Sequence, residues 1–421
     1  MKVKWFLAIV LVIFVFLDSI YLPFDFGFDF RLQYVVFLVT ILLYPFISRI
    51  NVRPSFLLLA AFILLFLLIT PLLVETPIWG PVRQVILIFI CLTPFYFMFS
   101  ALDFSYLRIF NLYLFFSYLI SLAGVIQFFS MLIHFKPGYD FSYLGFDMSR
   151  VAPDELRIQS WMLEPSFLVY ILTPALFYSL VRIFGLYKTQ IIRPKVQCFL
   201  VIVAVLLTRS LLGYLSVLLI GAIIFFTRFP IHRSPVYSFV LLLVLFGFAA
   251  FAFSIPALKL RIVDTFKVFS GANNEITSAN LSTQHFYDNY RVAIQSIKER
   301  PLSGVGLGNY HVMYEKLPHS APKGDLTPDG ASLFFRMITE TGMLFTLLAI
   351  LLTFHLRVRL KFLFSEQYKD LWIISNGIFV FLVMRWIRFP HYTAVGLAFF
   401  LMLYYISFNA SKLSRRQSLD G

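Results

Sequence analysis

Long runs of hydrophobic residues, separated by short polar breaks, make up most of this sequence. A helix that spans a bilayer needs about 20 mainly apolar residues, because the hydrocarbon core is about 30 Å thick. The runs that approach this length predict about twelve spanning helices, at residues 5–23, 32–48, 55–74, 84–102, 109–133, 166–184, 196–208, 211–227, 236–256, 332–354, 371–387 and 391–408. The pattern therefore predicts an all-α, polytopic integral membrane protein in which residues 1–421 form a single membrane domain.

Composition changes the class of partner that this chain is expected to bind. Of the 421 residues, 60% are hydrophobic and 13% are charged, whereas soluble domains carry about 25% charged residues, so an ordinary soluble enzyme is excluded. The net charge of +14 would indicate nucleic acid for a soluble protein. On a chain that mainly faces lipid it favours anionic head groups or substrates instead, and no nucleic-acid partner is expected. Cys91 and Cys198 lie in apolar runs, so neither a disulfide nor a zinc site is predicted.

Basic residues in the short connections set the predicted orientation, since cytoplasmic loops carry an excess of Lys and Arg. With the amino terminus inside, every inner segment is basic; these residues are Arg49, Arg53, Arg108, Lys188, Arg193, Lys195, Arg228, Arg233, Arg357, Arg359, Lys361, Lys369, Lys412, Arg415 and Arg416. Both termini are therefore expected on the cytoplasmic side. Two long polar segments, about residues 134–165 and 257–331, are expected on the outer face.

The second of these outer segments is predicted to contain a short amphipathic helix over residues 284–299. Its apolar side chains recur at helical spacing, with charges on the opposite face, and they are Phe286, Tyr290, Ala293, Ile294 and Ile297. We expect this helix to lie against the membrane or the spanning bundle, and to end at Arg300-Pro301 because the residue before proline avoids helical geometry. The glycine-rich stretch 304–308 after it lacks the context of a nucleotide-binding loop. Its backbone N–H groups are instead candidates for cradling a phosphate.

The outer face also carries basic residues, which are usually scarce there: Arg150, Arg157, Arg209, Lys259, Arg261, Arg291, Lys298, Arg300, Arg336, Arg385 and Arg388. Guanidinium groups stay charged and bind phosphate oxygens in a bidentate manner, so the predicted partner is an anionic, lipid-linked substrate. A functional role is favoured for Arg209 and Arg291, because charge at membrane depth is costly. For Lys259, Lys298 and Arg385, a side chain that reaches the membrane surface is favoured instead.

A carboxylate and a histidine are the candidates for acid–base chemistry. Glu164 precedes Pro165 at the expected start of a helix, so it is either a helix cap or a functional carboxylate beside arginines. His319 lies in the long outer segment, where it is either solvated or a general base. The outer histidines and Asp329 have no metal-ligand spacing, so no metal site is predicted.

Three motifs in this order resemble those of the O-antigen ligase and polymerase superfamily, which are multi-spanning bacterial glycosyltransferases. They are Arg157…Trp161…Glu164-Pro165-Ser166, Leu207-Thr208-Arg209-Ser210, and Tyr290-Arg291…Arg300-Pro301-Leu302-Ser303-Gly304-Val305-Gly306-Leu307-Gly308. The motifs extend from about Arg157 to Gly342, and the predicted topology is similar over the whole chain.

The resemblance implies transfer of a glycan from undecaprenyl pyrophosphate on the outer face of the bacterial cytoplasmic membrane, with no cofactor. The family's essential external arginines correspond to Arg209 and Arg291, which would hold the pyrophosphate and stabilise its charge as it leaves. The further candidates for substrate binding are Arg157, Arg300, Arg336 and Arg388. Expected partners are the lipid-linked glycan and membrane lipids, and candidate protein partners are a flippase and a chain-length regulator.

Departures from the family pattern bear on the choice between polymerase and ligase. Arg209 precedes the serine of its motif rather than following it, and Pro328-Asp329-Gly330-Ala331-Ser332 stands where ligases usually have a His-Asn pair. With the Glu164-Pro165 element, this favours a polymerase that joins lipid-linked repeat units. The alternatives are a ligase that transfers the glycan to lipid A core and a transporter of lipid-linked glycan. The base is left open between a loop histidine, Glu164 and neither.

Overall fold

The computed structural model describes residues 2–25, 29–47, 58, 61, 76–151, 153–191, 193–228, 247, 253–254, 256–270, 279, 281–318, 329–359, 366–393 and 396–420. These residues are mainly helical, as the sequence predicts. The helices are α1 (Lys2–Val15), α2 (Leu32–Ile47), α4 (Trp79–Ala101), α5 (Tyr106–Leu132), α6 (Pro165–Ile183), α7 (Lys195–Leu207), α8 (Leu211–Arg228), α10 (Pro256–Phe269), α11 (Leu281–Glu299), α12 (Tyr310–Tyr314), α13 (Leu333–His355), α14 (Glu366–Arg388) and α15 (Leu397–Asp420). Two short strands, β1 (Tyr21–Asp25) and β2 (Asp29–Arg31), pair antiparallel.

Five of the described helices are long and apolar enough to cross a membrane: α4, α5, α6, α13 and α14. Shorter apolar helices occur at Val3–Val15, Leu32–Ile47, Lys195–Leu207 and Leu211–Thr227. These helices indicate a membrane protein, although they do not confirm a count of twelve spans. Most residues of the predicted runs 55–74 and 236–256 lie outside the described residues.

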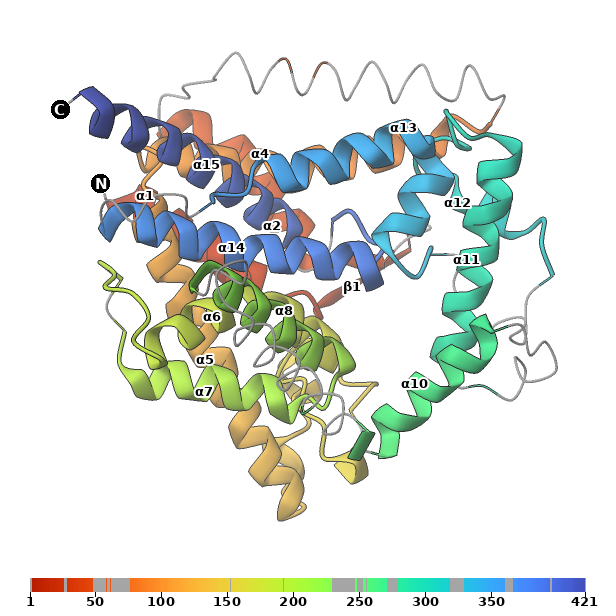
Figure 1. The fold of residues 1–421 in the computed structure, drawn as a ribbon, viewed down its shortest axis with the longest axis horizontal. Helices are drawn as coiled ribbons and strands as arrows, with labels where there is room; N and C mark the ends of the chain where they lie inside the picture. The colour runs from red at the N-terminus through yellow and green to blue at the C-terminus, as the bar shows by residue number, and fades with distance from the viewer. Residues whose placement is uncertain are drawn as a thin grey trace.

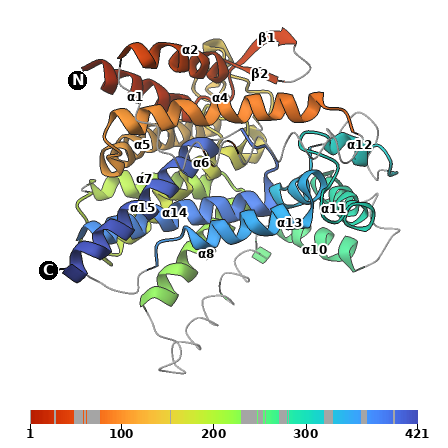
Figure 2. The same ribbon diagram turned by 90° about the horizontal axis from the view of Figure 1, so that it is seen from above.

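The long helices lie in a bundle with both ends of the described chain at one side. Figure 1 shows the labels N and C together on the left and α10–α12 at the opposite end, and Figure 2 shows the same separation from above. We call α10–α12 the outer layer. The outer segment of the sequence therefore forms helices that cover one end of the bundle.

Helices α6 and α14 form the centre of the bundle. In each, 83% of the apolar stretch is buried, against 39–44% in α4, α5 and α13. The two backbones approach closely at Gly377, where a Cβ atom would lie 2.9 Å from the Cα of Pro174. Close packing of this kind holds the ends of α6 and α14 in register, and both ends carry candidate site residues.

The first predicted span is wrong at its carboxyl end. The sequence predicts a helix over 5–23, but α1 ends at Val15 and Tyr21 begins strand β1. Asp18, which is 1% exposed, forms an ion pair with Arg31, the last residue of β2. A buried carboxylate needs such a partner, so the chain leaves the helix and turns back to supply it.

A break in α13 receives the loop that follows α11. Gly342 adopts φ 75° and ψ 177°, a conformation that is essentially restricted to glycine, and it kinks the helix. The N–H groups of Val305 and Gly306 donate to the carbonyls of Thr339 (2.8 Å) and Glu340 (2.9 Å). These two N–H groups therefore hold the loop against α13. They are not free to cradle a phosphate, which corrects the expectation from the sequence.

The same loop also contacts the start of α4. A Cβ atom on Gly308, where φ is +76°, would lie 2.5 Å from the carbonyl oxygen of Gly80. Asn309 then donates from its side chain to the carbonyl of Pro77 at 3.0 Å. The glycines thus allow the outer layer to dock on α4 and α13 at once.

Candidate functional site

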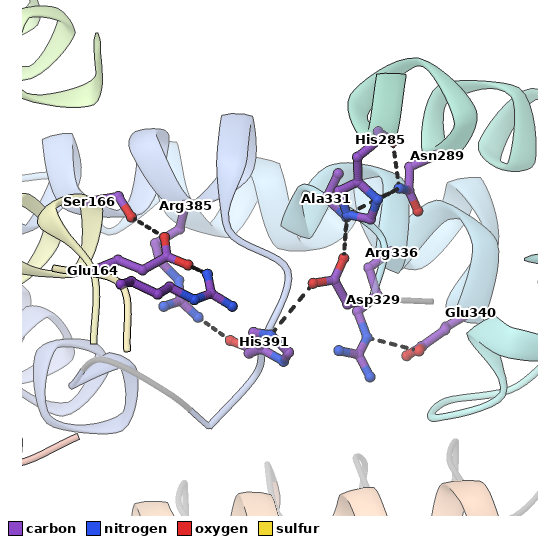
Figure 3. Close-up of polar contacts among 11 residues, drawn as sticks. Glu164, Ser166, His285, Asn289, Asp329, Ala331, Arg336, Glu340, Arg385 and His391 are labelled. Atoms are coloured by element: carbon purple, nitrogen blue, oxygen red, sulfur yellow. Dashed lines mark hydrogen bonds and ion pairs between the residues drawn. The ribbon is translucent and has the colours of Figure 1, made fainter. Parts of the chain in front are cut away.

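Charged side chains from segments far apart in the sequence lie where the outer layer faces the bundle, and Figure 3 labels Glu164, His285, Asp329, Arg336, Glu340 and His391 among them. They come from the loop before α6, from α11, from the segment just before α13 and the start of that helix, from the last residue of α14, and from the α14–α15 connection (residues 389–396). We call the following set the outer polar cluster: Arg150, Glu164, His285, Asp329, Arg336, Glu340, Arg388 and His391.

Asp329 lies between two histidines. Its Oδ1 accepts a hydrogen bond from Nε2 of His285 at 3.0 Å and another from the backbone N–H of Ala331 at 3.0 Å. Its Oδ2 lies 3.8 Å from Nε2 of His391. Oδ1 of Asp329 is thus bound by His285 and Ala331, whereas Oδ2 faces His391 in the α14–α15 connection (Figure 3).

The pKa values of this pair favour an ionised carboxylate and a neutral imidazole. Burial alone would raise the pKa of Asp329, but the hydrogen bond from His285 and the charges of both histidines lower it to about 2. Burial lowers the pKa of His391 to about 3, although Asp329 opposes this shift. The His391 side chain is nevertheless 40% exposed, so its ring remains accessible to a ligand.

A chain of polar contacts in α11 and α12 fixes His285. Asn289, which is fully buried, lies one turn after His285 and donates to its backbone carbonyl at 2.6 Å. The hydroxyl of Tyr310 donates in turn to the side-chain oxygen of Asn289. His285 and Asp329 therefore hold fixed positions relative to the outer layer.

Arg336 and Glu340 form a compensated pair at the start of α13. Nε of Arg336 donates to Oε1 of Glu340 at 2.9 Å, and the hydroxyl of Tyr392 donates to Oε2 at 2.9 Å. The guanidinium carbon of Arg336 also lies 4.9 Å from the centre of the Tyr392 ring. The pair thus connects α13 to the α14–α15 connection, and the positive charge of Arg336 is largely neutralised.

This pair supports a stability prediction, because Glu340 has no exposed surface. We expect Glu340→Gln to keep the side-chain volume but remove the countercharge of Arg336, at a cost of about 2 kcal/mol in the free energy of unfolding. Thermal unfolding in detergent measures this loss of stability. The control is Glu366→Gln, an exposed residue at the start of α14. Equal unfolding temperatures for wild type and Glu340→Gln would contradict the assigned pairing.

Arg388, the last residue of α14, points toward α11. It donates to the hydroxyl of Ser282, and its guanidinium carbon lies 5.3 Å from the centre of the Phe286 ring. Among the described residues, no carboxylate lies within ion-pair distance of Arg388, although Asp329 is close enough to act on it electrostatically. Arg388 therefore keeps a positive charge that an anionic ligand could neutralise.

Glu164 does not cap α6 through its side chain. It is the residue before the helix, but its carboxylate makes no capping hydrogen bond. Instead it forms an ion pair with Arg150 and accepts a hydrogen bond from the hydroxyl of Ser166 at 2.8 Å. Of the two interpretations open from the sequence, side-chain capping is therefore wrong. Phe167, near the start of α6, packs against Phe389 with ring centres 4.7 Å apart. This contact connects the start of α6, which carries the Arg150–Glu164 ion pair, to the α14–α15 connection.

Arg157 and Arg209 lie together in a separate group. Arg157 forms an ion pair with Glu155 at 3.0 Å, and its Nε donates to the carbonyl of Thr208. Arg209 has a left-handed backbone (φ 47°) and donates to the carbonyl of Glu155 at 2.8 Å. The predicted break between α7 and α8 is confirmed, and it meets the loop before α6.

Two other predicted residues, Arg291 and Arg300, lie in α11 or directly after it. Nη1 of Arg291 donates to the carbonyl of Pro318 at 3.1 Å. Arg300 directly follows α11, and its backbone carbonyl accepts from Gly304 at 3.2 Å. His319 lies outside the described residues. Of the predicted site residues, the outer polar cluster thus contains Glu164, Arg336 and Arg388.

Arg385 corrects another expectation. The sequence favoured a side chain that reaches the membrane surface, but Arg385 is fully buried. It donates to the backbone carbonyl of His391, and its guanidinium carbon lies 4.3 Å from the centre of the Phe389 ring. The α14–α15 connection folds back over α14 and supplies these contacts, so Arg385 holds His391 in place.

The amphipathic helix predicted over 284–299 is confirmed as α11, and its buried face agrees with the predicted one only in part: Ala293 is buried as expected, but several other buried positions are polar. Asp288, Asn289 and Ser296 are buried, whereas Tyr290 is 36% exposed. Ser296 donates to the carbonyl of Thr339 at 3.3 Å. Polar and small residues face inward because hydrogen-bond partners are available there, which leaves part of the apolar face uncovered.

The site also contains residues that the sequence did not single out, namely His285, Asn289, Tyr310, Glu340, His391 and Tyr392. A usable signal existed for Glu340 alone, because a carboxylate four residues after Arg336 in an apolar run predicts a helical ion pair. Among the described residues, no group of three or more His, Cys, Asp or Glu side chains is placed to hold a metal ion.

This arrangement combines an uncompensated arginine with a neutral imidazole next to a carboxylate. It can bind an anion and accept a proton at neighbouring positions. A scan against protein-family models matched none, and a search of curated proteins found no similar sequence.

Proposed function

We propose that this chain is a polysaccharide polymerase that transfers a growing glycan from undecaprenyl pyrophosphate to a lipid-linked repeat unit. The proposal depends mainly on the charge of Arg388, which forms no ion pair with a described carboxylate. Arg388 also lies only three residues before His391 in the chain. A leaving pyrophosphate develops negative charge, and a fixed guanidinium stabilises that charge.

The neighbouring arginines support this role for Arg388. Glu164 neutralises Arg150, and Glu340 neutralises Arg336. These compensated pairs shape the site without competing for the anion. Arg388 is therefore proposed to contact the pyrophosphate, while Arg336 stabilises the walls.

Arg209 and Arg291 remain proposed contacts for the same lipid-linked donor. The interactions described for both side chains go to backbone carbonyls, of Glu155 and Pro318. Such contacts leave the guanidinium charge intact. Because pyrophosphate, lipid and glycan together form a long ligand, we propose that these arginines contact it outside the outer polar cluster.

The proposed location is the bacterial cytoplasmic membrane, crossed about twelve times, with both termini in the cytoplasm and residues 257–331 outside. Two features support it. The described ends of the chain lie on one side of the bundle, and α10–α12 lie on the other (Figure 1). Transfer on the outer face requires this arrangement.

The test is a reconstitution in lipid nanodiscs with a radiolabelled repeat unit on undecaprenyl pyrophosphate. A polymerase gives a ladder of lipid-linked products that increase by one repeat unit. A ligase gives product only when lipid A core is added, and a transporter gives no covalent product. Either of the last two results would contradict the proposal.

A further inference from the structure

We propose that His391 is the general base that deprotonates the acceptor hydroxyl, and that Asp329 is its positioning residue. This inference rests on the proposed transfer function and names the residue that the sequence left open.

His391 is held from two sides while its ring stays accessible. Arg385 binds its backbone carbonyl, and the ring packs edge-on against Phe389 with centres 5.3 Å apart. The side chain is still 40% exposed. A base needs both a fixed orientation and access to its substrate, and His391 has both.

Asp329 determines which ring nitrogen would accept the proton. Its Oδ1 is occupied by His285 and Ala331, so Oδ2 is the oxygen that faces Nε2 of His391. The separation of 3.8 Å is longer than a hydrogen bond, and catalytic contacts often shorten only when substrate binds. A carboxylate beside Nε2 favours the tautomer with the proton there, which leaves Nδ1 as the acceptor.

The other titratable groups of the outer polar cluster are less suited to this role. Both oxygens of Glu340 are engaged, and the residue is fully buried. Glu164 is tied to Arg150 and Ser166. His285 contacts Asp329 through one ring nitrogen and Asn289 through the other. His391 is the one with an accessible ring and a single carboxylate neighbour.

The proposed step is balanced as follows. The acceptor hydroxyl gives its proton to Nδ1 of His391, and its oxygen forms a bond to the anomeric carbon of the donor. The bond between that carbon and the pyrophosphate oxygen breaks, and its electron pair leaves on the pyrophosphate, next to Arg388. The imidazolium then releases its proton to water.

Burial, and after it the surrounding arginines, lower the pKa of His391 and keep the ring neutral in the free protein. Asp329 raises its pKa, whereas Arg336, Arg31 and Arg385 lower it, in addition to the larger effect of burial. The neutral ring is the form that accepts a proton. Bound pyrophosphate would offset the arginine charges and raise the basicity of His391 when acceptor is present.

The experiment compares His391→Gln with wild type in the nanodisc assay. Glutamine keeps a donor near Asp329 but cannot act as a base, so we expect kcat to fall about 10²- to 10⁴-fold. His311→Gln, in α12 of the same outer layer, is the matched control and should retain wild-type kcat. An active wild type with an equally active His391→Gln overturns the base and leaves the transfer function intact. A wild type that elongates nothing overturns both.

Asp329→Asn tests the positioning role. Loss of the carboxylate lowers the pKa of His391. We therefore expect kcat to fall, and the acidic limb of the kcat–pH profile to move to lower pH. Asp329→Glu should recover part of kcat. A purely structural role for Asp329 would lower kcat without moving the limb, and that result would overturn the assignment of Asp329.

Discussion

Replacing Arg388 with alanine is expected to lower the rate of glycan transfer about 10²- to 10³-fold. The guanidinium lies at the junction of α14 and α11, and none of the described carboxylates pairs with it. Its charge is therefore available to the pyrophosphate that would leave in the proposed transfer. The rate is measured as labelled repeat units joined per minute in nanodiscs.

Two further variants separate this role from a structural one. Arg388→Lys keeps the charge but loses the bidentate geometry, so it should recover only part of the rate. Arg108→Ala removes an exposed arginine at the start of α5 and should leave the rate unchanged. If Arg388→Ala folds normally and still elongates at the wild-type rate, Arg388 does not bind the pyrophosphate.

Replacing Gly342 with alanine is expected to detach the 301–308 loop from α13. An added Cβ atom would lie 2.2 Å from the carbonyl oxygen of Leu302, and the backbone conformation is strained for any other residue. Strain and lost hydrogen bonds together cost on the order of 3–4 kcal/mol in the free energy of unfolding. Thermal unfolding in detergent and limited proteolysis of the outer layer measure the loss.

The matched control is Gly221→Ala in α8. Gly221 lies in a regular helix with no atoms within 4 Å of the added Cβ position. Alanine there should leave stability unchanged or raise it by about 1 kcal/mol, because alanine favours helices over glycine. Similar unfolding temperatures for Gly342→Ala and Gly221→Ala would show that the kink in α13 does not hold the loop.

Most described helices could be predicted from the sequence because each is encoded locally by a run of apolar residues. Predicted run 109–133 corresponds to Tyr106–Leu132, and 166–184 to Pro165–Ile183. The antiparallel pair of strands β1 and β2 was not predicted, because the interaction that produces it is not local in sequence. Asp18 lies beside an apolar run, and only pairing with Arg31 explains why the helix ends early.

The site could be predicted only in part, for the same reason. Charges in an apolar sequence are conspicuous, so Glu164, Arg336 and Arg388 could be singled out. The partner of each depends on tertiary packing: Asp329 and His391 are 62 residues apart, and no local pattern connects them. Arg385 shows the reverse case, since its burial depends on the α14–α15 connection that folds over it.

The docking of the 301–308 loop has a consequence for biosynthesis. Ribosomes make the chain from its amino terminus, so this loop emerges before Thr339 and Glu340, whose carbonyls accept its N–H groups. The loop must therefore wait, undocked, until α13 has been synthesised and inserted. His391 emerges later still. A nascent or truncated chain that ends before His391 therefore cannot assemble the outer polar cluster.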